Sequence, residues 1–117
     1  MDDYLNHETL AALRELDEPG KTVFMVKIIN AYLSDTEELL KEVRAAHRSG
    51  NPALLAKLAH SLKGTSLNVG ADGLASLMKM IEREGEKGIL CAPDRVTQAE
   101  AGFHQVRNAL NAYKKSL

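Results

Sequence analysis

The segment 51-NPALLAKLAHSLKGTSLNVG-70 decides the fold of this chain. Asn51 is a favoured N-cap residue, Pro52 is well placed at the first position of a helix, and Gly70 is a natural helix stop. Between these signals, residues suited to a core recur at helical spacing. They are Leu54, Leu55, Leu58, Leu62, Thr65, Ser66 and Val69. The segment therefore predicts a helix that runs to about Val69 and buries one side in a core.

The flanking sequence predicts further helices. A short helix is expected over 6–16, with Asn6 as its cap, followed by the helix-breaking sequence 17-DEPG-20. A long helix is expected over 21–49, another from residue 71 or 72 to the glycines at 85 and 88, and a last one from 93 to 117. No segment has the alternation typical of a strand. The chain is therefore predicted to be all-α: an antiparallel four-helix bundle with a short additional N-terminal helix, forming a single domain over 1–117.

Composition and charge exclude several classes of function. The formal net charge is −1 and the basic residues are dispersed, so we expect no binding to nucleic acid. No apolar run approaches the roughly 20 residues of a membrane span, so we expect a cytoplasmic domain without membrane contact. Cys91 is the only cysteine, and His7, His47 and His104 fall in separate segments without the spacing of paired metal ligands. We therefore expect no metal site.

His60 lies opposite the expected core. At about 100° per residue, the apolar arc of its helix falls between about 120° and 240° from His60. Gly64 falls at about 40°, on the solvent side, although a glycine inside a helix costs about 1 kcal/mol relative to alanine. Its missing side chain would leave the imidazole open to another protein. Lys57 and Lys63 fall about 60° to either side of His60 and could attract a phosphoryl group or an acidic pocket.

An apolar residue also falls on this solvent face. Leu67 lies at about −20° from His60 on the same wheel. Together with Ala56 and with the lysines at its rim, it predicts a shallow docking patch around His60.

The stretch 59-AHSLKGTSLNVGA-71, followed by Leu74, resembles the signature of histidine-containing phosphotransfer (HPt) domains. These domains are intermediates of multistep two-component phosphorelays. The segment 32-YLSD-35 of the long helix is similar to an aromatic-leucine-x-Asp segment of the family. The resemblance implies that His60 is the phosphorylated residue, that Lys63 assists near the phosphate, and that Gly64 leaves the imidazole accessible. Asn51 stands where many members have Asp, and both residues cap helices well.

The resemblance also implies the partners. A phosphorelay intermediate exchanges its phosphoryl group with the aspartate of response-regulator receiver domains, including those attached to hybrid sensor histidine kinases. The chain is expected to be a monomer without a cofactor, with Mg²⁺ on the partner receiver domain. It contains no nucleotide-binding loop, so we expect no ATP-dependent kinase activity.

Two interpretations remain open at this point. One is a phosphocarrier; the other is a helical interaction module that docks a receiver or kinase without moving phosphate. The combination of His60, Lys63 and Gly64 favours the first, because docking alone does not need a histidine. Glu82, Glu84 and Glu86 are interpreted as a solvated helix end rather than as catalytic groups, and Met78 and Met80 as core and near-core residues.

Overall fold

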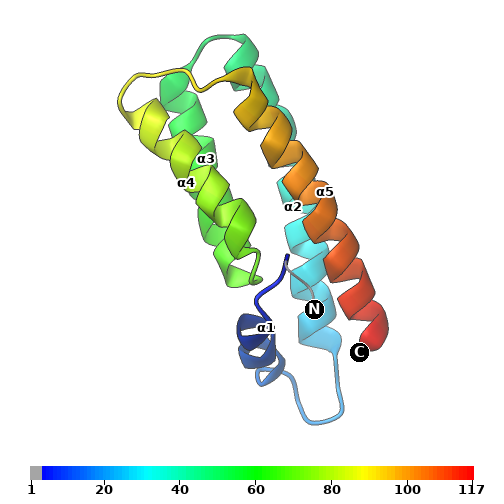
Figure 1. Ribbon diagram of the computed structural model, residues 1–117. Coiled ribbons are helices and arrows are strands. Elements are labelled where there is room, and N and C mark those ends of the chain that lie inside the picture. Colours follow the sequence, from blue (N-terminus) through cyan, green and yellow to red (C-terminus); the bar gives the residue numbers. More distant parts are fainter. Residues whose placement is uncertain (1–3) are drawn as a thin grey trace.

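The computed structural model describes residues 4–117, and every regular element within that range is an α-helix (Figure 1). The elements are α1 (His7–Arg14), α2 (Val23–Arg48), α3 (Pro52–Asn68), α4 (Asp72–Glu86) and α5 (Pro93–Ser116). The prediction of an all-α fold is confirmed for these residues. The helix boundaries agree with the sequence signals to within about two residues, and this includes the short α1, which begins one residue later and ends two residues earlier than expected.

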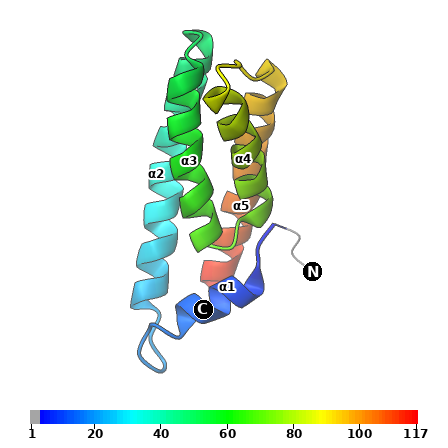
Figure 2. The same cartoon turned by 90° about the vertical axis from the view of Figure 1, so that its left-hand side faces the viewer.

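Four long helices form the body of the molecule, whose extents are 48 × 23 × 20 Å. Figure 1 shows α3 beside α4 and α2 beside α5, Figure 2 shows α2 beside α3, and in both views all four helices are aligned along the long dimension. The short α1 lies across the end where α2 begins. Short connections join neighbouring long helices, so each helix can bury one face against the others.

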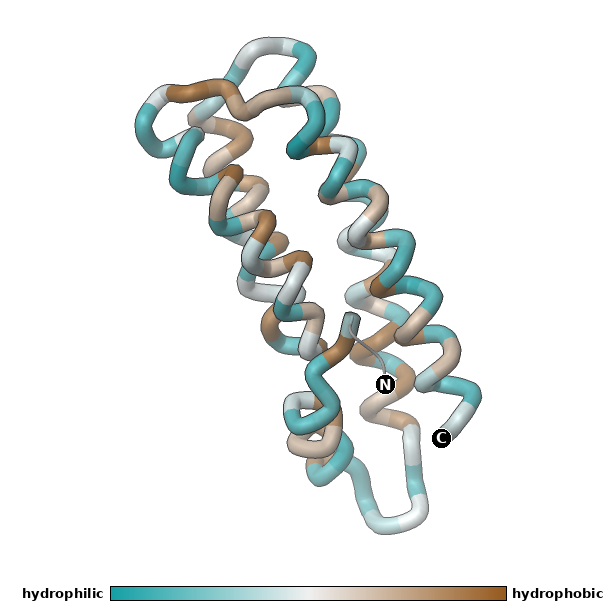
Figure 3. Tube along the Cα trace, viewed as in Figure 1, coloured by the Kyte–Doolittle hydropathy of each residue, from teal (hydrophilic) through white to brown (hydrophobic). Residues whose placement is uncertain are grey.

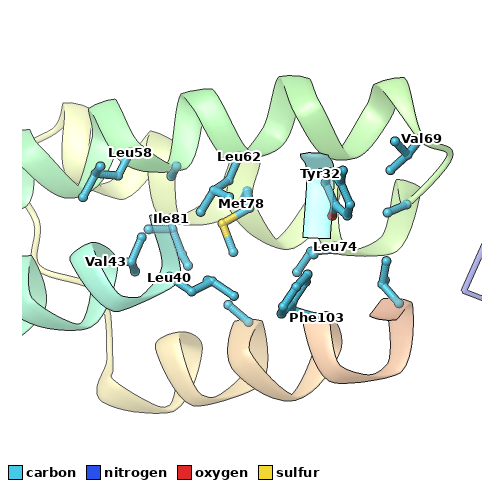
Figure 4. Close-up of a cluster of buried hydrophobic side chains, with 14 of the residues drawn as sticks. Tyr32, Leu40, Val43, Leu58, Leu62, Val69, Leu74, Met78, Ile81 and Phe103 are labelled. Carbon is cyan, nitrogen blue, oxygen red and sulfur yellow. The ribbon is translucent and has the colours of Figure 1, made fainter. Parts of the chain in front are cut away.

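The core lies between these two pairs of helices. Hydrophobic segments recur along each helix between hydrophilic ones, as expected for amphipathic helices (Figure 3). In Figure 4, Leu62 of α3 and Met78 of α4 point toward Leu40 of α2 and Phe103 of α5. Burial of Met78 confirms its expected core position, whereas Met80 is 43% exposed and does not pack as core.

The buried arc of α3 is rotated relative to the sequence prediction. Leu54 is 40% exposed and Thr65 is exposed, although both were expected in the core. Ala59 is instead fully buried, and Ala56 is only 9% exposed. The buried side of α3 is closer to α4 than predicted, because α4 packs closely on the side of α3 that carries Ala56 and Ala59. His60 consequently lies at the edge of the α3–α4 contact rather than opposite the core.

Gly85 is the residue that permits this close approach. A Cβ atom at Gly85 would lie 2.5 Å from the carbonyl oxygen of Pro52 and 3.0 Å from the Cβ of Ala56. The sequence interpretation had Gly85 and Gly88 together end the helix, and the observed end at Glu86 lies between them, so α4 continues through Gly85. Gly85 is therefore a packing residue, and the left-handed Gly88, with φ of 76°, follows the helix.

Side-chain caps fix the N-terminal end. Asn6 caps α1 as predicted: its side chain accepts hydrogen bonds from the amides of Glu8 and Thr9. The backbone N–H of Asn6 also donates to the Gly70 carbonyl at 2.7 Å, which attaches the start of α1 to the α3–α4 turn. A further cap was not foreseen. The Asp17 carboxylate accepts hydrogen bonds from the backbone amides of Phe24 and Met25 in the first turn of α2, at 2.8 and 3.0 Å.

Within residues 4–117, the structure contains no helix whose length and apolar character would let it cross a membrane.

Gly85→Ala should destabilise the protein by about 1 to 3 kcal/mol, because the new methyl group overpacks the α3–α4 contact. Gly64→Ala is the matched control: a Cβ there meets nothing within 4 Å, so helix propensity should add up to about 1 kcal/mol. Urea unfolding of both variants measures the two effects. Equal stability changes in the two variants would contradict the close approach described above.

Candidate functional site

His60 projects from α3 at the edge of the α3–α4 contact. Its side chain is 69% exposed, in agreement with the predicted solvent-facing position. The imidazole is nevertheless anchored, because Nδ1 lies 2.6 Å from Oε2 of Glu82 on α4. One ring nitrogen is therefore held by the protein. Among residues 4–117, Nε2 has no hydrogen-bond partner.

Glu82 is the centre of the site. Its side chain is only 11% exposed, and its two oxygens bind different residues: Oε2 contacts His60, and Oε1 accepts a hydrogen bond from Nζ of Lys63 at 2.6 Å. The Lys63 ammonium lowers the pKa of Glu82 below its ordinary value, and the contact with His60 lowers it further. Burial raises the pKa of Glu82, but by less than these contacts lower it. Glu82 is therefore an ionised carboxylate at neutral pH.

This geometry corrects the interpretation of the three glutamates on α4. Glu84 forms an ion pair with Arg95 at 3.6 Å, and Glu86 is exposed, as a solvated helix end would be. For Glu82 the interpretation is wrong. The periodicity of α4 contained the signal, because Glu82 comes four residues after the buried Met78 and directly after the buried Ile81. A carboxylate on that stripe requires a partner.

An ionised carboxylate can only accept hydrogen bonds, so Nδ1 of His60 must carry the proton in their contact. In the neutral imidazole, the lone pair then resides on Nε2. Nε2 is thus the nucleophilic nitrogen, and the contact between Nδ1 and Glu82 fixes the orientation of the ring. Lys63 supports this arrangement indirectly, because it keeps Glu82 ionised and holds it in place.

The other predicted site residues surround His60 in different ways. A Cβ at Gly64 would meet nothing within 4 Å, and Lys57 is exposed. Leu67 is 48% exposed on the solvent side, where it was expected. Ala56 is not on an open surface: it is buried against α4, because Gly85 lets the two helices approach. The expected exposure of Ala56 is therefore wrong, and only its edge reaches the hollow beside His60.

That hollow has a volume of about 390 Å³ and lies along the α3–α4 seam. Its other lining residues are Lys57, His60, Ser61, Glu82 and Glu86. Within the part of the chain that the structure describes, no cluster of three or more His, Cys, Asp or Glu residues is arranged to hold a metal ion. The chemistry of the hollow therefore rests on one nucleophilic nitrogen with charged groups around it.

An exposed imidazole that a buried carboxylate orients is suited to carrying a phosphoryl group. The Hpt domain family matches residues 27–115, and the chain belongs to this family. The fold is similar to the crystal structure of histidine-containing phosphotransfer protein B (HptB) from Pseudomonas aeruginosa PAO1. The TM-score is 0.89 at 30% sequence identity, over 100% of this chain and 99% of that one. A search of curated proteins gives no match.

Glu82 should make the stability of the fold depend on acid. Its pKa is lower in the folded protein than in the unfolded chain, so its contribution is present above the unfolded pKa and is lost as pH falls through the folded one. Glu82→Gln should cost about 1 kcal/mol near pH 5. The difference from wild type should begin to shrink as pH falls below the ordinary carboxyl pKa of about 4.3, and it should vanish only below the lowered pKa of folded Glu82, where the carboxylate is protonated in both states.

Urea unfolding at intervals between about pH 5 and pH 3 tests this expectation. Glu86→Gln, one helical turn further along α4, is the matched control and should leave the unfolding free energy nearly unchanged. A wild-type advantage over Glu82→Gln that grows toward low pH would show that the carboxylate is not held ionised.

Proposed function

We propose that this chain accepts a phosphoryl group on Nε2 of His60 from the aspartyl phosphate of a receiver domain. It then passes the group to a response-regulator aspartate, and the same chemistry can run in reverse. The observation that supports this most directly is the 2.6 Å contact between Nδ1 of His60 and the buried Glu82 carboxylate. That contact leaves the opposite ring nitrogen free and exposed.

The transfer needs no proton donor on this chain. The Nε2 lone pair attacks phosphorus, the bond between phosphorus and the aspartyl oxygen breaks, and the aspartate leaves as a carboxylate. The imidazole then carries phosphate on Nε2 and a proton on Nδ1, so positive charge develops on the ring. The Glu82 carboxylate lies beside that charge and stabilises it, while fixing the angle of attack. The receiver is expected to supply the Mg²⁺ that neutralises the phosphoryl oxygens.

Lys63 takes a different role from the one that the sequence suggested. The expectation was direct assistance at the phosphate, but its ammonium is bound to Glu82 and its side chain is only 26% exposed. We assign it as a positioning residue that acts through Glu82. Lys57 is exposed on the other flank of His60 and lines the same hollow, so it is the cation that can meet an incoming acidic surface.

The surface beside His60 supports docking of a receiver. On the α3 wheel, Gly64 lies at about 40° and Asn68 at about 80° from His60, toward α2. Beyond them a largely apolar pocket of about 350 Å³ lies between α2 and α3, lined in part by Ile28, Thr65 and Asn68. The missing side chain at Gly64 opens the path from this pocket to the imidazole. Leu67 adds an exposed apolar contact on the opposite side.

The scaffold suits a small carrier. In the proposed unit, helices α2 to α5 form an antiparallel four-helix bundle, α1 closes one end, and residues 1–117 act as one monomeric domain in the cytoplasm. The alternative, a docking module without phosphotransfer, leaves the His60–Glu82–Lys63 arrangement without a purpose. A docking surface needs neither an oriented imidazole nor a buried carboxylate behind it.

Incubation with a phosphorylated donor receiver should label this chain on His60 alone, and ATP without a donor should give no label. The label should be lost in acid and retained in base, as expected for a phosphoramidate. His60→Gln removes the nucleophile and should abolish labelling, whereas His104→Gln, an exposed histidine on α5, should not change it. Labelling of His60→Gln at the wild-type rate would refute the proposal.

Gly64→Gln should slow transfer at least tenfold without loss of stability, because its side chain projects between the docking pocket and the imidazole. Gly73→Gln is the matched control: it also places a side chain in open space, but at the start of α4, at the opposite end of that helix from Glu82. Rates from rapid-quench transfer assays and unfolding curves separate the two effects. Comparable slowing in both variants, or unfolding of Gly64→Gln alone, would contradict the proposed path of approach.

A further inference from the structure

A groove distinct from both the hollow at His60 and the pocket between α2 and α3 lies between α2 and α5. It has a volume of about 480 Å³, and none of its nine lining residues belongs to the hollow at His60. Figure 1 shows that α2 and α5 form the helix pair on the other side of the core from α3 and α4. The groove is therefore a separate surface from the phosphotransfer site.

The groove is positively charged in a chain whose formal net charge is −1. Its lining includes four cationic side chains and two carboxylates: Lys41, Arg44, Arg48 and Arg107 against Glu37 and Glu100. This excess is concentrated on one face, whereas the rest of the molecule is acidic on balance. A local field of this kind attracts an acidic partner even though the whole protein does not.

Internal contacts hold the walls of the groove in place. The Arg44 guanidinium binds the Glu100 carboxylate and the Thr97 hydroxyl, which connects α2 to α5 across the groove. The Arg107 guanidinium lies 5.7 Å from the centre of the ring of Phe103, which is itself buried. Because these side chains are already ordered, binding an occupant would require little additional loss of freedom.

Two of the cations have no acidic partner within residues 4–117. Arg48 forms no ion pair there, and Arg107 donates only to Nδ1 of His104, at 2.9 Å. The cations do not converge on one point, as a site for a single phosphate would require. The groove residues of α2 extend instead from 37 to 48, which corresponds to about 16 Å along a helix. The occupant that matches this shape is elongated.

We propose that the groove between α2 and α5 docks an acidic helix of a partner protein. The carboxylates of that helix would meet Arg48 and Arg107. Because the groove is on a different helix pair from His60, a protein bound there leaves the imidazole free. The chain could thus hold one partner while it exchanges phosphate with another, a function beyond phosphotransfer itself.

The test uses the whole chain, labelled with ¹⁵N, and a capped peptide of about 18 residues, long enough to span the groove as a helix. The peptide has glutamates at helical spacing among alanines. Titration should shift the amide signals of residues 37–48 and 100–107 in a saturable manner, and added salt should weaken binding. A peptide with lysine in place of each glutamate should not bind.

Arg48→Glu/Arg107→Glu should weaken binding of the acidic peptide about tenfold, given the usual strength of exposed ion pairs. Lys79→Glu/Lys87→Glu is the matched control: it changes the net charge equally, on exposed residues of the α4 region, and should have little effect. Arg48→Gln/Arg107→Gln repeats the test if the reversed charges disturb the fold. Absence of saturable shifts, shifts centred on His60, or equal weakening by the control would overturn the proposal.

Discussion

The close approach of α3 and α4 at Gly85 is the constraint on which the functional site depends. Where a side chain would collide with the backbone of Pro52 and with Ala56, glycine allows the two helices to come together. Glu82 lies almost one helical turn before Gly85, so the same approach brings its carboxylate to both His60 and Lys63. A wider spacing would remove Glu82 from hydrogen-bonding distance and leave the imidazole free to rotate. Packing in the core thus sets the chemistry at the surface.

Two opposing electrostatic effects meet at Glu82. Burial disfavours its charge, but one ammonium group and one imidazole N–H satisfy both oxygens and keep the carboxylate ionised. This arrangement gives a solvent-exposed histidine a defined orientation and a defined proton position, which exposed histidines ordinarily lack. In the proposed transfer, this arrangement prepares the nucleophile and leaves the remaining charge stabilisation to the partner.

The two helix pairs carry surfaces of different character. Beside α3 and α4 lie the imidazole, the open position at Gly64 and the apolar Leu67, which suit transient contact with a receiver. Between α2 and α5 lies a positive groove whose walls are braced by Arg44 and Phe103. The two surfaces lie on different helix pairs of the bundle, so contacts made on one need not obstruct the other.

The sequence by itself determined the helices, the exposed histidine and the open glycine. Those features are local: Asn51, Pro52 and Gly70 delimit α3, and the periodicity of α3 places His60 and Gly64 outside the core. The periodicity could not show where around α3 its neighbours pack. Only the tertiary structure decided that α4 covers Ala56, that Leu54 is left exposed, and that Glu82 lies within hydrogen-bonding distance of the imidazole. These outcomes depend on contacts between residues about 20 to 30 positions apart, and a helical wheel of one segment contains no information about the distance to the next.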